Sequence, residues 1–427
     1  MARHLAPAEL GTYFLASALV FIPIGILEYS FTSSIIQNNK VNRLDYQAVL
    51  MINLVAALVF FILGITAAYL LARYYSNYNI YKYYLWLVPI LFIWQATSIQ
   101  NAGLKKSLRF KHFSLIEIGA SLMNFAIAMG MIWGGYGVES LVAGQLGKAI
   151  LLFLILSVMT DFIGFSFRGT TAFISKHFDY GKYILGEKSF GVLIGYMDTF
   201  LVHHFLGAEI LGVYDLMKRI IMRPLTAAYV SLEQVLFPLL TKANQAISAY
   251  KELFRNFTKL SSVFMLCLLL VLIREELLSF FPMIYQAQSY LFSCLIIYSC
   301  SLIISNPIDI VSYSFDMTQK YFKWTVIYSS VQIVIMIFSL QLGLPQMLIS
   351  LTVSNLILYL LSYYVLFRSD KRMSSIDWAR PVHFFILLVM VLILLTKVEW
   401  PLGIAVFLFL LMYTVLHFVM YKSKSQP

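Results

Sequence analysis

Residues 46–73 read YQAVLMINLVAALVFFILGITAAYLLAR, and this stretch decides the fold class. It contains no acidic residue, and its only basic residue is the last one, Arg73. A helix of about 20 apolar residues, rising ~1.5 Å per residue, crosses the ~30 Å hydrocarbon core of a membrane. The stretch therefore predicts a transmembrane helix.

The same pattern continues along the chain of 427 residues, of which 60% are hydrophobic and only 12% charged, with a mean hydropathy of +0.81. A soluble protein would carry roughly 25% charged residues. The composition therefore excludes a soluble globular enzyme and a disordered or fibrous chain, and it predicts an all-α polytopic membrane protein. Thirteen runs are long enough to span, at residues 10–29, 46–73, 83–103, 114–136, 139–160, 183–205, 211–240, 259–280, 289–315, 322–343, 345–367, 381–397 and 400–421.

The net charge of +11 does not indicate nucleic acid as a partner, because the basic residues lie mostly in short loops between apolar runs. Most of them occupy every second loop, beginning with residues 30–45, and membrane proteins keep such loops in the cytoplasm. This asymmetry predicts a cytoplasmic C-terminus. Cys267, Cys294 and Cys300 lie inside apolar runs, so we expect packing residues and no disulfide framework.

A short motif occurs twice in the chain. Gly11-Thr12-Tyr13 precedes Pro23 at the same distance at which Gly212-Val213-Tyr214 precedes Pro224. The second copy lies six runs after the first, an even number, so both run in the same direction, as in transporters built from two parallel-repeat bundles. The second copy follows an apolar run, at 183–205, and the first copy does not. We therefore expect that the first helix is missing from this sequence, through a misplaced start codon.

The repeat and the loops predict four regions. Residues 1–160 form an N-terminal bundle of five helices, and residues 161–182 form a cytoplasmic loop between the two halves. Residues 183–370 form a six-helix C-terminal bundle, and residues 371–427 form two extra helices and a cytoplasmic tail.

Five basic residues lie inside the apolar runs, where a central charge costs about 2.5–3.5 kcal/mol on insertion scales. They are Lys148, Lys188, Lys218, Arg219 and Arg223. Arg219 and Arg223 share one helix face with Asp215, and guanidinium groups about one helical turn apart suit phosphate or pyrophosphate. We predict that the five basic residues line a water-filled cationic cavity that binds the substrate, with the two arginines as its main ligands.

Internal pairing is the alternative to this cavity. Asp215 could pair with Arg219, and Asp198 could pair with Lys188 or with Arg219. Lys218 fits snorkelling to the outer interface as well as it fits contact with a ligand.

Acidic residues at membrane depth are candidates for ion pairing or for coupling to an ion gradient. They are Asp198, Asp215, Glu233 and Asp309. Asp309 follows Asn306-Pro307, and a helix kink with local capping explains it more simply than a proton site.

Metal and catalytic motifs are missing from the sequence. His203-His204 resembles a metal pair but has no third ligand at helical spacing, which favours an interfacial position. The sequence contains no Walker A loop, no His-Glu-x-x-His and no Gly-x-Ser-x-Gly. We therefore expect neither an enzyme nor a resident cofactor or metal.

The opening Ala2-Arg3-His4-Leu5-Ala6-Pro7-Ala8-Glu9-Leu10-Gly11-Thr12-Tyr13 resembles the A-R-x-L-x-P-x-x-x-G-x-Y opening of bacterial Wzx-like polysaccharide flippases. These flippases belong to the multidrug/oligosaccharidyl-lipid/polysaccharide exporter (MATE-like) superfamily. Many relatives have Tyr-Arg where this chain has Lys218-Arg219, so Arg219 keeps the match. Further matches are Ile35-Ile36-Gln37, Leu108-Arg109-Phe110-Lys111, Met197-Asp198, Gly207, Leu211-Gly212-Val213-Tyr214 and Phe237-Pro238.

The resemblance implies a fold of fourteen helices, in which two six-helix bundles form a V around a central cavity and two helices follow. It also implies alternating-access flipping of undecaprenyl-pyrophosphate-linked oligosaccharide across the bacterial cytoplasmic (inner) membrane, for O-antigen, capsule or exopolysaccharide assembly. Membrane lipid, a polysaccharide polymerase and chain-length machinery are the implied partners.

Two other functions compete with flipping. A cation-coupled multidrug exporter of the same superfamily would bind cations through carboxylates, so an arginine-bearing cavity counts against it. A non-transporting membrane scaffold is the second alternative, and the charged helix faces disfavour it.

Overall fold

The computed structural model describes residues 4–28, 42–106, 110–159, 164, 166, 170–242, 278–305, 308–309, 312 and 317–367. Every regular element in this part of the chain is a helix, which confirms the predicted all-α class. Contacts divide the chain into unit 1, Met1–Asp215, and unit 2, Leu216–Pro427. The elements are α1 (Pro7–Glu28), α3 (Arg43–Tyr74), α4 (Asn79–Lys106), α5 (Phe110–Trp133), α6 (Glu139–Met159), α7 (Thr170–Lys242), α10 (Met283–Gln286), α11 (Ser289–Ser305), α13 (Thr318–Leu340), α14 (Leu344–Ser362) and the π-helix η1 (Tyr363–Phe367).

The predicted membrane character is confirmed by the lengths of the helices. Seven helical stretches among the described residues are long and apolar enough to cross a membrane. They are Pro7–Glu28, Arg43–Tyr74, Ser114–Trp133, Glu139–Met159, Leu185–Thr226, Thr318–Leu340 and Leu344–Leu366. The predicted runs at 381–397 and 400–421 and most of the run at 259–280 lie outside the described residues, so the number of thirteen stays a prediction.

Helix α3 begins at a capping box. The side chain of Asn42 accepts a hydrogen bond from the backbone N–H of Asp45 at 2.9 Å, and the Asp45 carboxylate accepts one from the backbone N–H of Asn42 at 2.9 Å. Two N–H groups that the helix leaves unbonded are satisfied in this way, and such a cap contributes about 1 kcal/mol.

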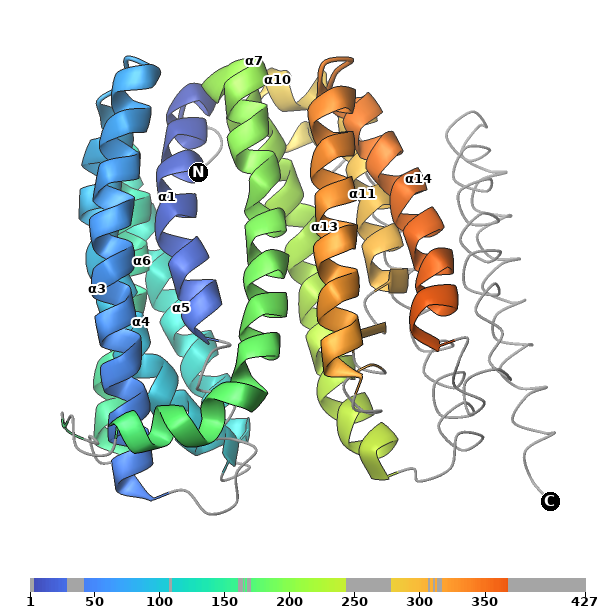
Figure 1. The fold of residues 1–427 in the computed structure, drawn as a ribbon. Helices are drawn as coiled ribbons and strands as arrows, with labels where there is room; N and C mark the ends of the chain where they lie inside the picture. Colours follow the sequence, from blue (N-terminus) through green and yellow to red (C-terminus); the bar gives the residue numbers. More distant parts are fainter. Residues whose placement is uncertain are drawn as a thin grey trace, which may run out of the picture. The chain divides into compact units, whose positions relative to one another are not determined.

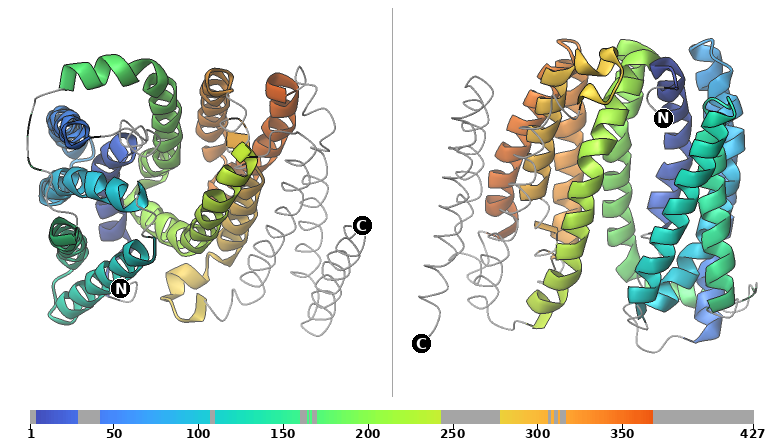
Figure 2. Two further views of the ribbon diagram at one scale, coloured as in Figure 1. Left: turned by 90° about the horizontal axis from the view of Figure 1, so that it is seen from below. Right: turned by 180° about the vertical axis from the view of Figure 1, so that it is seen from behind.

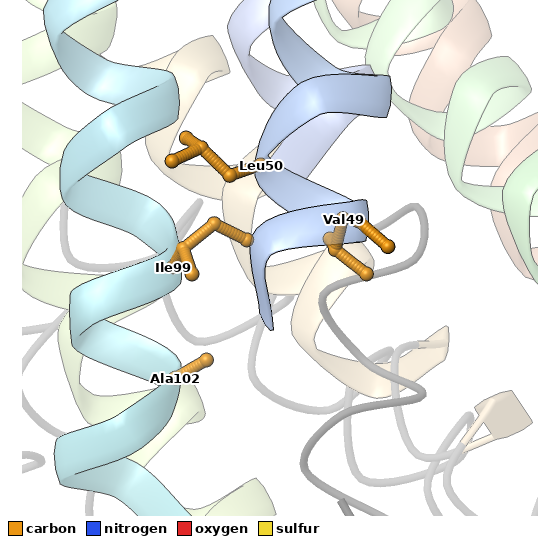
Figure 3. Close-up of a cluster of buried hydrophobic side chains, with 5 residues drawn as sticks. Val49, Leu50, Ile99 and Ala102 are labelled. Atoms are coloured by element: carbon orange, nitrogen blue, oxygen red, sulfur yellow. The ribbon is translucent and has the colours of Figure 1, made fainter. Parts of the chain in front are cut away.

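Helices α3 and α4 pack through a close apolar seam in unit 1 (Figure 1). Val49 and Leu50 of α3 meet Ile99 and Ala102 of α4 in a buried cluster, as Figure 3 shows. Further along the seam, Gly64 leaves room for the ring of Tyr84. The opposite face of α3 carries apolar side chains that are 50–60% exposed, as lipid contact requires: Leu58, Val59, Ile62 and Leu63.

Aromatic side chains collect at one end of the helices of unit 1. Tyr74 and Tyr78 stand at the turn between α3 and α4, and Trp133 and Tyr136 stand at the turn between α5 and α6. Their exposed fractions run from 59% to 77%. Such a belt of amphipathic rings is typical of a membrane–water interface.

Helix α7 is interrupted once. Gly207 has φ 86° and ψ 174°, a backbone conformation that side-chain-bearing residues rarely adopt, and it separates two helical arms. The arms correspond to the predicted runs at 183–205 and 211–240. The first arm begins at Thr170, inside the range 161–182 that the sequence predicts as a loop.

Unit 2 contains a polar seam between its helices α11, α13 and α14. Tyr328 donates a hydrogen bond to Asn355 Oδ1 at 2.8 Å, and Asn355 Nδ2 donates to Ser301 Oγ at 3.1 Å. Ser354 donates to Gln332 Oε1 at 3.2 Å. Helices α13 and α14, drawn in orange in Figure 2, run side by side where these bonds form. Interhelical hydrogen bonds of this kind average about 0.6 kcal/mol each in a membrane.

Candidate functional site

The two copies of the Gly-x-Tyr motif contact each other in unit 1, where α1 meets α7 just after Gly207 (Figure 1). A Cβ atom on Gly11 would overlap the carbonyl oxygen of Ala208. A Cβ atom on Gly212 would in the same way overlap the carbonyl oxygen of Pro7. The contact is thus reciprocal, and only glycine lets the two backbones come this close.

Asp198 is held by a short hydrogen bond across the break at Gly207. The hydroxyl of Tyr214 donates to Asp198 Oδ2 at 2.6 Å, and the backbone N–H of Thr199 donates to Asp198 Oδ1 at 2.8 Å. Asp198 is only 5% exposed and Tyr214 is fully buried. The repeat motif therefore supplies, through its second tyrosine, a direct partner for a carboxylate at membrane depth.

Replacing this tyrosine is expected to destabilise the fold. Tyr214→Phe removes a donor from a buried carboxylate, and hydrogen bonds to charged groups contribute about 1.5–3 kcal/mol. We expect a lower thermal midpoint for the purified protein in detergent. In an Asp198→Ala background the same replacement should have little further effect, and an equal loss in both backgrounds would contradict this assignment.

The basic residues of α7 beyond the break become more exposed along the helix. Asp215 is buried, Lys218 and Arg219 are partly buried, and Arg223 and Thr226 are exposed. Arg219 and Arg223 keep the one-turn spacing that the sequence predicts, because the helix is uninterrupted between them. Their role as substrate ligands stays a prediction.

The first arm of α7 carries an open face. No heavy atom of the described residues comes within 4 Å of a Cβ atom placed on Gly191 or on Gly195. Lys188, on the same stripe, is partly buried and lies 3.6 Å from the carboxylate of Glu187. The stripe therefore offers space for a bulky group beside an ammonium.

Lys148 lies in an ion pair between α5 and α6. Its Nζ is 3.1 Å from Glu117 Oε2 and donates a hydrogen bond to Ser121 Oγ at 3.1 Å. Gly144 of α6 leaves room for Asn124 of α5, so the two helices approach closely near this pair. The predicted role of Lys148 as a substrate ligand remains untested, but in this structure its charge is already balanced.

The structure gives little information on two of the acidic candidates for ion pairing or coupling, Asp309 and Glu233. Asp309 is partly buried, and the side chain of Glu233 lies outside the described residues. Within the described ranges no group of three or more His, Cys, Asp or Glu side chains is arranged to hold a metal ion.

Three contacts escaped the sequence analysis. They are the pairing of Glu117 with Lys148, the hydrogen bond from Tyr214 to Asp198, and the packing of Tyr75 on the ring of His203 at a centroid distance of 4.3 Å. The Gly-x-Tyr repeat was the one available signal for Tyr214. Contacts between distant helices leave no comparable pattern in one sequence.

Comparison with known proteins places these features in a family. A family model described as "Polysaccharide biosynthesis protein" matches residues 1–281. The chain is 26% identical over 255 residues to the teichuronic acid biosynthesis protein TuaB of Bacillus subtilis (strain 168), covering 58% of this chain and 52% of that protein. It is 24% identical over 199 residues to the amylovoran biosynthesis protein AmsL of Erwinia amylovora, covering 45% of this chain and 50% of that protein. The matches thus span about half the length of these curated relatives.

Two solved structures share the fold. The lipid II flippase MurJ, in an inward closed conformation, gives a TM-score of 0.68 at 14% identity and covers 97% of this chain and 92% of that one. An inward-facing multidrug resistance MATE family transporter of the MOP superfamily gives 0.64 at 12% identity and covers 92% and 93%. With its family model, its apolar helices and this MATE- and MurJ-like fold, the chain is a multi-pass membrane protein that belongs to the polysaccharide biosynthesis protein family.

Proposed function

We propose that this protein is a flippase that carries undecaprenyl-pyrophosphate-linked oligosaccharide units across the bacterial cytoplasmic membrane by alternating access, for the assembly of a surface polysaccharide. Family membership supports the saccharide, and the fold shared with MurJ and a MATE transporter supports movement of a substrate across the membrane. The excess of basic residues in alternate loops supports a cytoplasmic C-terminus and loading from the cytoplasmic leaflet.

One observation carries the proposal: two arginines lie one turn apart on one face of a transmembrane helix, and Arg219 is partly buried while Arg223 is exposed. Guanidinium groups bind phosphate oxygens through paired N–H donors, and they stay charged at any physiological pH. An arginine inside an apolar helix is costly, so it is expected to serve a function. In this proposal the pyrophosphate lies against the two arginines while the polyprenyl tail stays in lipid.

The open face of the first arm of α7 supports the same substrate. Gly191 and Gly195 leave space beside Lys188, as a bulky oligosaccharide headgroup requires. Lys188 and Lys218 would add cationic contacts around the headgroup, and Lys148 would do so only if it exchanged Glu117 for the substrate. The polymerase and chain-length machinery would take up the product at the outer face.

The test uses a strain in which the gene is deleted and a sugar probe that reaches only the cell surface. Lipid-linked units should accumulate inside the deletion strain, and the intact gene should restore them to the surface. Arg219→Ala should lower surface delivery about 10- to 100-fold, which is the loss of one charge-assisted phosphate contact. Arg73→Ala, an exposed arginine at the end of α3, is the matched control and should restore delivery fully.

Two outcomes would reject the proposal. Normal surface glycan in the deletion strain, together with sensitivity to cationic dyes, would assign drug export instead. Full delivery of surface glycan by both Arg219→Ala and Arg223→Ala would show that neither guanidinium group is needed to bind the substrate.

A further inference from the structure

His203 is a buried histidine near the end of the first arm of α7. Its side chain is only 4% exposed, and within the described residues neither ring nitrogen has a hydrogen-bond partner. Its neighbour His204 is exposed. A buried imidazole whose two nitrogens are both unpaired is unusual, because most buried polar atoms are satisfied.

The turn between α3 and α4 covers this histidine. The ring of Tyr75 meets the ring of His203 edge to face at 4.3 Å between centroids, and the Tyr75 hydroxyl lies 3.3 Å from His204 Nδ1. Burial and the neighbouring Tyr74 raise the pKa of Tyr75, so its hydroxyl keeps its proton at neutral pH. We call Tyr74, Tyr75, His203 and His204 the aromatic cap.

The same turn also holds α1. Asn77 Nδ2 donates a hydrogen bond to Thr12 Oγ1 at 3.2 Å, next to Gly11 and its contact with α7. Ser76, between the two contacts, has φ 51°, in the left-handed region. The turn between α3 and α4 therefore contacts both helices that carry the Gly-x-Tyr motif, α7 through Tyr75 and α1 through Asn77.

Within the part of the chain that the structure describes, no carboxylate is paired with the ring of His203. Tyr75 on α3 and His204 on α7 are the titratable side chains beside it, and Tyr74 stacks on His204 at 6.0 Å. The guanidinium of Arg73 lies over the ring of Tyr69 at 6.0 Å. Of the other charged groups described at this end, Glu9 on α1 and Glu209 on α7 are exposed, and Lys82 on α4 pairs with Glu139 on α6 at 3.3 Å.

We propose that His203 is a proton-binding site that releases the aromatic cap when it is protonated. The neutral imidazole can stay buried, whereas an imidazolium without an acceptor or counter-ion must move to water, and the rings of Tyr75 and His204 would separate as it leaves. Proton binding is thus weaker in the capped form than in the uncapped form, so acid favours the uncapped form.

The position of the aromatic cap determines from which side of the membrane a proton would reach His203. The orientation predicted from the loop charges puts the turn between α3 and α4 outside the cytoplasm, so the proton would come from the outer side. Opening of the cap there would help to release the substrate outward; this link to transport rests on the proposed function, whereas proton binding by His203 does not.

The experiment measures the cap itself. Spin labels are attached at Asn79→Cys and Glu209→Cys, two exposed positions on either side of the cap, after the three native cysteines are changed to serine. The full chain is studied in nanodiscs of phosphatidylethanolamine and phosphatidylglycerol. Between pH 7.5 and pH 5.5 the ratio of long to short label distances should rise about tenfold.

Variants at the two histidines separate the proposal from a general effect of acid. His203→Gln and His203→Phe cannot be protonated, and both should keep the short distance at both pH values. His204→Gln, the matched change at the exposed neighbour, should keep the response to pH. An unchanged response in both His203 variants, or no response in the parent, would overturn the proton site. These readouts require no substrate, so failure of the flippase proposal would leave them intact.

Discussion

Gly11→Ala and Gly212→Ala are each expected to destabilise the protein strongly. A single methyl group at either position would overlap a backbone carbonyl oxygen of the facing segment, that of Ala208 or that of Pro7. Backbone cannot rotate away as a flexible side chain can, so the two helices must separate. Overpacking of this kind costs about 1–3 kcal/mol, and we expect at least the upper end of that range. Thermal unfolding of the purified protein in detergent measures it.

Two features make this test specific. Gly191→Ala and Gly195→Ala add the same methyl group to α7, the helix of Gly212, at positions where the described residues leave open space. These two variants should have unchanged or slightly higher thermal stability. Because the contact is reciprocal, the double variant Gly11→Ala, Gly212→Ala should lose less than the sum of the two single losses. Equal thermal midpoints for Gly11→Ala and Gly195→Ala would show that the close approach is not needed.

Glu117→Gln is expected to lower stability by about 2 kcal/mol. Among the described residues, it leaves the ammonium of Lys148 with the hydroxyl of Ser121 as its one partner, in a helix interface of a membrane protein. The two side chains are 19% and 28% exposed, so the loss should lie between the ~0.2–1 kcal/mol of a surface pair and the ~3–5 kcal/mol of breaking a buried one. Lys148→Met should cost a similar amount, because it leaves the carboxylate unpaired.

The double variant Glu117→Gln, Lys148→Met removes both charges and should recover most of this stability. It also decides what Lys148 does. If the double variant delivers surface glycan at the parent rate, the pair only holds α5 to α6. If delivery falls while the thermal midpoint recovers, Lys148 contacts the substrate, as the sequence predicts.

The helices were predictable because hydropathy is a local property. The predicted run at 46–73 lies within α3, and the run at 139–160 differs from α6 by one residue at its end. The helical start of α7 at Thr170 was not predicted, because the stretch around it is polar enough to resemble a loop. A helix there depends on contacts that one sequence does not reveal.

The sequence predicted which residues belong to the candidate site better than it predicted which side chains pair with one another. Helical spacing placed Arg219 and Arg223 on one face, since that requires only the helix itself. The partners of Asp198 and Lys148 come from other segments, and here they are Tyr214 and Glu117. The repeat of Gly11 and Gly212 was visible in the sequence, but their mutual contact required the packed helices.

The length of α3 links the protein to the thickness of its membrane. Its 32 residues extend about 48 Å, whereas the hydrocarbon core is only ~30 Å thick. Tyr74, exposed at one end, anchors that end among the lipid headgroups, so the excess length lies towards the capping box at Asn42. Such a helix accommodates a thinner bilayer by tilting further. Because α3 packs along α4, the acyl-chain length of the host lipid acts on the tilt of both helices together, and with it on the height at which Asn42 meets the aqueous phase.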